Sequence, residues 1–469
     1  MGMIAMVHPK RLISKRKTAP MRDRGRTQLP LVEPAIEHEH AGELRQMRRV
    51  VDEHPEMAEV VPADLIRGLS HPDTGRRGRM SAEQVLMALF IKQMNDFSYE
   101  GLAYHLADSR TYRAVCGVGI GDTVPSDKTR QRDIKKIGAG TLEAINRILM
   151  ASAAAKGIEK GRTVRVDCTV VESTIHHPTD SSLLWDCVRV LSRWTQHATE
   201  ISEGIVANHC RRAKRRALGI LNARSTKERK QRERDLLKVA HNTVTDAERV
   251  RADLKRGPTT DPLKAMVIEA QLQHYVALAR QVITQTERRV LGGESLSPQD
   301  KIVSIFEAHT DIIIKDRRET LFGHKVTLTG GGSGLLTDLV IERGNPADVT
   351  LAARMMTRQQ AIFGRVPRQA AFDGGFASKD NLKTIKELGV QDVVFAKKRG
   401  LAISEMAKST WVYKKLRDFR AGIEGMISFL KRGFALGRCT WRGFASFQAY
   451  AWSSVLTANF LLVARRAPA

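Results

Sequence analysis

The first strong hydrophobic pattern in the chain is helical and begins at Ser81. In SAEQVLMALFIKQM, Ser81 precedes Gln84 by three residues, which is the spacing of a capping box, and a broad apolar stripe follows. SYEGLAYHLAD and SRTYRAVCG predict two further short helices, and another helix is expected around residues 40–53. VPSDKTRQRDIKKIG predicts a helix that starts at Ser126 or Asp127.

This last helix carries Lys128, Arg130 and Arg132 in its first turns. Several short helices that end in a basic one are typical of a helix-turn-helix module. We therefore interpret residues 76–155 as an all-α DNA-binding domain in which these three cations contact phosphates. The alternative is that the helices pack on the next domain and leave a solvated basic face.

From residue 160 the pattern becomes that of strands. GRTVRVDCTVV alternates β-branched residues, and strand signals return at KIVSIFEAHTDIIIKD, GHKVTLT and LLTDLVIE. GGGSG at residues 330–334 lacks the ending of a phosphate loop and is interpreted as a hairpin connection. RQAAFD and QDVVFAK predict two short strands that alternate with helices. Together these signals predict a mixed α/β sheet.

The segment at about 183–295 is helical and highly charged, and it interrupts the strand pattern. We expect two or more long helices, broken by GPTTDP at 257–262, that form an insertion within the domain rather than a domain of its own fold. RRAKRRALGILNARSTKERKQRERDLLK is its most basic run. These cations could bind phosphates, but Glu228, Glu233 and Asp235 at helical spacing equally suit a self-paired, solvated face.

The chain of 469 residues has a formal net charge of +26 and a pI near 10.2. Such a charge favours a polyanionic partner, and nucleic acid is the first candidate, with an anionic membrane surface as the rival. The most apolar run, residues 451–464, contains Ser453, Ser454 and Asn459 and is too short to span a bilayer, so no membrane partner is expected.

The N-terminal region and the cysteines indicate the cellular compartment of the chain. Residues 1–75 are charged and contain prolines, so we expect a basic, partly disordered N-terminal region without the apolar core of a signal peptide. The five cysteines form no C-x-x-C pair, which excludes a simple zinc site or disulfide framework. A reducing cytosol is the expected compartment.

Three acids stand out as candidates for chemistry. Asp167 interrupts the apolar alternation of the first strand, Asp373 ends the strand QAAFD before two glycines, and Glu424 lies in the run FRAGIEGMISFLKRGF. Carboxylates from separate elements can converge on a pair of divalent cations, and Mg²⁺ prefers oxygen ligands. On a helix, Arg420 and Lys431 fall within roughly 40° of Glu424. The alternative for Glu424 is an ordinary Arg–Glu pair without function.

The run Arg420-x3-Glu424-x6-Lys431 resembles the end of the Y-x2-R-x3-E-x6-K signature of insertion-sequence DDE transposases, most closely the ISNCY type. The signature's tyrosine position is Arg417 here, with Tyr413 displaced. VDCTVVESTIHHPTDSSLLWD is similar to the first-aspartate block, FDGGFAS to the second, and residues 80–140 to the helical N-terminal domain that precedes the catalytic domain in such enzymes.

This resemblance implies an RNase H-like catalytic domain over residues 160–469 and a DNA strand cleavage and transfer reaction. Asp167, Asp373 and Glu424 would hold two Mg²⁺ ions, with Mn²⁺ as a substitute, while Arg420 and Lys431 would hold DNA phosphates. The implied partners are double-stranded DNA, as terminal inverted repeats and target, and a second copy in a homodimer on DNA. A bacterial, nucleoid-associated location in the cytoplasm is expected.

Two other functions remain open from the sequence. One is a catalytically inert DNA-binding protein derived from a transposase, which loss of a triad acid would indicate, although all three are present. The other is a metal-dependent nuclease without strand transfer.

Overall fold

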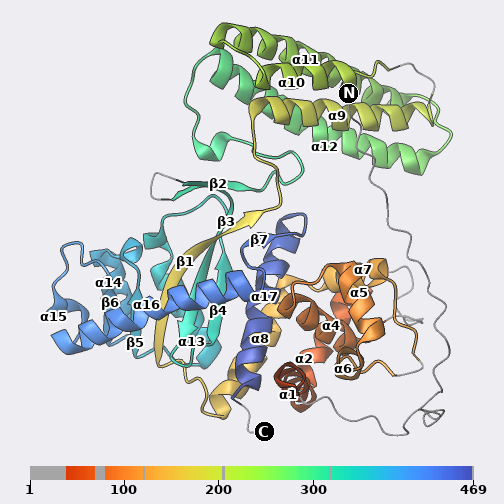
Figure 1. Ribbon diagram of the computed structural model, residues 1–469. Coiled ribbons are helices and arrows are strands. Elements are labelled where there is room, and N and C mark those ends of the chain that lie inside the picture. The colour runs from red at the N-terminus through yellow and green to blue at the C-terminus, as the bar shows by residue number, and fades with distance from the viewer. Residues whose placement is uncertain (1–37, 69–79, 120–121, 203–205, 316–318, 467–469) are drawn as a thin grey trace, which may run out of the picture.

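A mixed sheet of seven strands forms the centre of the chain in the computed structural model, which describes residues 38–68, 80–119, 122–202, 206–315 and 319–466 (Figure 1). The expected partly disordered region at 1–75 falls largely outside these residues. The strand order is β2-β3-β1-β5-β6, with β4 also paired to β3 and β7 to β1. The strands are β1 (Thr163–Ser173), β2 (Asp311–Lys315), β3 (Glu319–Gly331), β4 (Leu336–Ile341), β5 (Gln369–Phe372), β6 (Asp392–Phe395) and β7 (Arg438–Cys439).

The directions of the strands match the predicted fold class. β1, β3 and β4 are antiparallel neighbours, whereas β5 and β6 continue the sheet parallel to β1. The consecutive strands β2, β3 and β4 pair in hairpin order, and β5 and β6 then alternate with helices, which is the mixed α/β, RNase H-like arrangement that the sequence predicts. The GGGSG segment connects β3 to β4 as a hairpin, as expected.

One strand prediction is too long. In KIVSIFEAHTDIIIKD, the described strand covers only Asp311–Lys315. The preceding residues are irregular because side chains take their backbone groups: the amide of Gln285 donates to the carbonyl of Ile302 at 3.2 Å and accepts from its N–H at 2.8 Å. A Gln side chain has thus replaced a neighbouring strand as the partner.

The described residues before β1 form helices and their connections, without a strand. Ser81 and Gln84 form the predicted capping box, and Ser126 caps the predicted basic helix α7. The elements are α1 (Glu39–Glu53), α2 (Glu56–Glu59), α3 (Pro62–Ile66), α4 (Ala82–Met94), α5 (Tyr99–Asp108), α6 (Arg110–Val115), α7 (Asp127–Lys136) and α8 (Ala139–Ala155).

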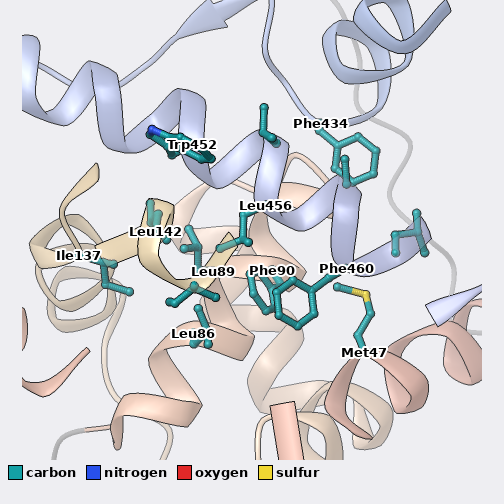
Figure 2. Close-up of a cluster of buried hydrophobic side chains, with 14 of the residues drawn as sticks. Met47, Leu86, Leu89, Phe90, Ile137, Leu142, Phe434, Trp452, Leu456 and Phe460 are labelled. Atoms are coloured by element: carbon teal, nitrogen blue, oxygen red, sulfur yellow. The ribbon is translucent and has the colours of Figure 1, made fainter. Parts of the chain in front are cut away.

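These helices share their core with the other end of the chain. Helix α17 (Phe444–Ala464) packs against α1, α4 and α8 and also reaches β4 (Figure 1). Figure 2 shows Phe460 and Leu456 of α17 beside Phe90 and Leu89 of α4, all completely buried. One continuous apolar cluster therefore joins the N-terminal helices to the sheet.

Helix α17 is apolar around its whole circumference because it is buried on all sides. Its polar residues are satisfied inside the core: Asn459 exchanges hydrogen bonds with the backbone of Leu336 and donates to Asn146, and Ser454 accepts from Gln93. Within the described ranges, no helix has the length and apolarity that a bilayer crossing requires.

The insertion forms a helical bundle with its own apolar core. It begins at Asp180, with Thr179 as the N-cap, and its helices are broken as predicted, since α11 ends at Arg256 and α12 starts at Pro262. It lies at the far end of β1, beyond β2 (Figure 1). The helices are α9 (Asp180–Thr199), α10 (Cys210–Leu221), α11 (Thr226–Arg256) and α12 (Pro262–Thr286).

The remaining helices cover the sheet. α16 runs across β1, β5 and β6 and carries the run that contains Glu424 (Figure 1). A third apolar cluster lies between β5, β6 and their helices. These helices are α13 (Ala352–Phe363), α14 (Lys379–Glu387), α15 (Ile403–Met406) and α16 (Thr410–Gly433).

Candidate active site

The two candidate aspartates lie side by side on neighbouring parallel strands. Val166 of β1 pairs with Phe372 of β5, and each is followed immediately by an acid, Asp167 or Asp373. Because paired positions on parallel strands advance together, the two carboxylates belong to the same level of the sheet. Asp167 is 16% exposed in its side chain and Asp373 is 41% exposed.

Backbone turns hold Asp373 at the end of β5. Asp373 is the N-cap of a short 3-10 helix (Gly374–Phe376). The two glycines that follow are required by close packing rather than by a positive φ: a Cβ on Gly374 would lie 2.8 Å from Cβ of Lys397, and one on Gly375 would lie 2.6 Å from Oδ2 of Asp348. Side chains of the chain itself therefore occupy the space beside both glycines.

Glu424 reaches the aspartates from α16. Arg165 fixes this helix to β1 by donating from Nη1 to the carbonyl of Phe419 at 2.9 Å, with its guanidinium 4.6 Å from the Phe419 ring centre. Gly422 makes the close approach possible, because a Cβ there would collide with the Arg165 guanidinium. α16 thus lies against the strand that bears Asp167.

Arg420 connects all three acids. Its Nη1 lies 3.3 Å from Oδ2 of Asp167 and 3.2 Å from Oδ1 of Asp373, and its Nη2 lies 2.9 Å from Oε1 of Glu424. The Arg420 side chain is only 14% exposed, whereas that of Glu424 is 66% exposed. Three acids that are distant in sequence therefore meet at one guanidinium, as the sequence predicted for a common site.

The charge balance of this cluster is unfavourable for Asp167. Burial, together with the nearby Asp373 and Glu424 carboxylates, raises the pKa of Asp167 to about 6. The N–H of Cys168, which donates to Oδ1 at 2.7 Å, and the Arg420 guanidinium oppose this rise in pKa. An additional cation beside Asp167 would therefore stabilise its ionised form.

The donor set suits a hard divalent cation, since three carboxylates offer only oxygen ligands. In the arrangement described, the Arg420 guanidinium already bridges them. Among the residues that the structure describes, no three His, Cys, Asp or Glu side chains form a ready-made metal site. The oxygen ligands of these residues are therefore of the kind that Mg²⁺ or Mn²⁺ prefers. For a metal ion to bind them, Arg420 would have to give up some of its contacts with the three acids.

The predicted phosphate-binding cations divide into exposed and buried ones. Lys128 and Arg132 are exposed on α7, and Lys431 is half-buried on α16. Arg130 is only 2% exposed and lies on the inner face of α7 with Asp133 and Ile134, so its guanidinium is turned away from any DNA at the surface. The structure does not support a phosphate contact by Arg130 in this conformation.

Two features of the site were missed or left open by the sequence. Arg165 anchors α16, and its position two residues before Asp167 on a strand places both on one face, a signal that was available. Tyr413, displaced from the signature position, is buried with its hydroxyl 3.3 Å from the Phe395 carbonyl, whereas Arg417 at that position is exposed.

Two family models match the chain. One, the transposase DDE domain, matches residues 314–460 and spans Asp373, Arg420, Glu424 and Lys431; the other, a transposase domain (DUF772), matches residues 31–133. β1 with Asp167 and the helical insertion lie between the matched ranges. No curated protein and no solved structure matches the chain. The two matches support the resemblance to the insertion-sequence DDE transposases.

Proposed function

We propose that this chain, which two transposase domain models match, is a DDE transposase that binds the terminal inverted repeats of its insertion sequence and catalyses Mg²⁺-dependent strand cleavage and strand transfer. The observation that carries the proposal is the meeting of Asp167, Asp373 and Glu424 on one guanidinium. A fold that buries an acid beside two others at a cost in its ionisation is typical of a functional site.

In this proposal the three acids are the metal ligands. Asp167 and Asp373 supply oxygens from the sheet, and Glu424 supplies them from α16. Bound divalent cations would activate water at the scissile phosphodiester and stabilise the leaving 3′ oxygen. The carboxylates provide the negative charge that holds such cations, and the surrounding strands fix their directions.

Arg420 has two roles in this proposal. In the metal-free chain it neutralises the three acids and keeps them together. With divalent cations present, the same guanidinium is free to bind a DNA phosphate, because a planar fork of N–H donors suits phosphate as well as carboxylate. Lys431, further along α16, would hold a second phosphate.

DNA binding rests on charge and on the helical N-terminal region. The net charge of +26 favours a polyanion, and Lys128 and Arg132 are exposed on α7. A homodimer on DNA remains a prediction, made because transposition must bring two ends together. The double substitution Lys128→Gln and Arg132→Gln on α7 should weaken binding of the terminal repeats.

The proposal is tested with a labelled duplex that carries one terminal inverted repeat from beside the gene, incubated with a target duplex and Mg²⁺. The wild-type chain should produce a nicked end and then a joined product. Asp373→Asn should lower cleavage on the order of 10³-fold, because a lost metal ligand costs several kcal/mol of transition-state stabilisation. Binding of the duplex should stay within a few-fold of wild type.

Asp418→Asn is the matched control, since Asp418 is a largely exposed acid on α16 whose one ion pair within the described part of the chain is with Arg417. It should cleave and join like the wild type. Retained cleavage by Asp373→Asn would remove Asp373 from the site. Nicking without any joined product would favour a nuclease, and binding without nicking would favour an inert DNA-binding protein.

A further inference from the structure

The basic run of the insertion is divided between two helices, α10 and α11, which differ in whether their cations have acidic partners. On α11 and α12, seven of the twelve lysines and arginines lie beside an acid of the same bundle, in line with the self-paired face that the sequence left open. The pairs are Arg229–Glu233, Arg232–Glu228, Arg249–Asp246, Arg251–Glu269, Lys255–Glu269, Lys264–Glu200 and Arg280–Glu248.

Helix α10 has no such compensation. Its sequence CRRAKRRALGIL contains five cations within six positions and no acid. Arg211, Arg212, Lys214 and Arg215 are exposed, and none of them forms an ion pair with any residue that the structure describes. The buried residues Ala213 and Ile220 lie on the opposite side of the helix. The cations therefore face solvent as one surface, here called the α10 basic face.

Leaving four like charges together without acids is unfavourable within the protein, because neighbouring cations repel one another. The same arrangement is favourable when phosphates occupy the surface, since each contact releases a counterion from DNA. Ala213 and Ile220 pack into the bundle core and hold α10 against its neighbouring helices. An exposed row of three arginines and a lysine on such a helix suits a phosphate backbone better than a single anion.

The position of the bundle points to the same partner. α9 starts seven residues after β1 ends, so the insertion is tethered to the strand that carries Asp167. The end of β1, at Ser173, lies six residues beyond Asp167, or roughly 20 Å along the strand. β1 therefore leads from the candidate active site to the bundle (Figure 1), so a duplex bound at that site would run close to the bundle if it extended in the same direction.

We propose that the α10 basic face is a sequence-independent binding site for the phosphate backbone of double-stranded DNA. This inference rests on the proposed function, because the DNA is the substrate of the same enzyme. Leu218 and Leu221 are also exposed near the end of α10, at 50% and 63%, which makes an anionic lipid surface the rival partner. The charge of the whole chain and the transposase domains favour DNA.

The test compares the salt dependence of binding to a duplex of arbitrary sequence. The full-length variant R211Q/R212Q/K214Q/R215Q should bind about tenfold or more weakly than wild type at moderate salt. The slope of log K against log salt should fall by about 2 or more, since each phosphate contact contributes about 0.9. The double variants R211Q/R212Q and K214Q/R215Q should each produce about half of the change in slope.

The matched control is R229Q/R249Q/K255Q/R280Q, which removes the same number of exposed cations from the same bundle. These four are 55–64% exposed in their side chains, but each has an acidic partner. Its slope should therefore change much less. All variants are first compared by thermal unfolding monitored by circular dichroism.

Equal slopes for wild type and the α10 variants would overturn this inference alone, because DNA binding through other surfaces would remain. Absence of salt-dependent DNA binding by wild type would overturn the proposed function as well. Unchanged DNA binding combined with lost binding to phosphatidylserine-containing vesicles would assign the α10 basic face to a lipid surface instead.

Discussion

Helices α16 and α10 both carry dense positive charge, and their cations have different partners. Arg420 on α16 is 14% exposed and contacts three acids from three elements. The exposed cations of α10 contact no acid among the described residues. The role of a cation is therefore indicated by the residues that it contacts rather than by the number of cations nearby. A cation with several acidic partners holds the protein's own acids together, whereas exposed cations without such partners can bind an external anion.

The largest expected effect comes from removing the organising cation. Arg420→Ala should destabilise the metal-free protein by about 2–3 kcal/mol, because three carboxylates lose their common partner in a partly buried site. Addition of Mn²⁺ should restore much of the loss, since a divalent cation replaces the missing charge. Thermal unfolding with EDTA or Mn²⁺ measures both, and equal stability of variant and wild type in EDTA would contradict the role of Arg420.

A second change tests how closely α16 lies on β1. Gly422→Ala should destabilise the protein by about 1–3 kcal/mol, because the new Cβ collides with the Arg165 guanidinium that anchors the helix. Gly425→Ala, three residues away, has open space around its Cβ and should stabilise by up to about 1 kcal/mol through helix propensity. Chemical denaturation distinguishes the pair, and similar effects at both sites would contradict the close contact.

Asp167 gives a pH-dependent prediction. Its folded-state pKa of about 6 lies above the ordinary value of 3.8, so ionisation of Asp167 reduces stability as pH rises through this interval. In EDTA, Asp167→Asn should therefore be about 1–2 kcal/mol more stable than wild type above pH 6, and the gain should disappear below about pH 4. Unfolding at pH 4 and pH 8 measures it, and a gain that is the same at both values would contradict the shift.

The smallest change in stability is expected for the exposed cations of α10. Arg215→Ala on α10 should change stability by less than about 0.5 kcal/mol, because the exposed side chain has no ion-pair partner among the described residues. Arg417→Ala should behave similarly, because Arg417 is exposed on α16 and its one ion pair to a residue that the structure describes is with Asp418, at 3.7 Å. A loss of stability at Arg215 or Arg417 as large as that of Arg420→Ala would contradict the different roles assigned to these cations.

The sequence predicted the elements that have strong local signals. The capping box at Ser81, the strand around Asp167 and the break before Pro262 are all confirmed. The meeting of the three acids was also predicted, because an acid within one strand, an acid at the end of another and an acid on an amphipathic helix are visible in the pattern and match a family signature.

The rest depends on tertiary packing. Arg130 was expected at the surface, yet it lies at i−3 and i−4 from the buried Asp133 and Ile134, on the inner face of α7. The shared core between α17 and the N-terminal helices joins segments more than 300 residues apart, for which a single sequence contains no local signal. The Arg420 bridge was missed for the same reason, since only its pairing with Glu424 is local in sequence.

The most direct test of the catalytic proposal is the anomalous diffraction of crystals grown with Mn²⁺. We predict a manganese peak in contact with carboxylate oxygens of Asp167 and Asp373. The Arg420 guanidinium should then no longer bridge these two acids. A structure in which Arg420 still bridges both aspartates, with manganese absent from them and bound elsewhere, would contradict it.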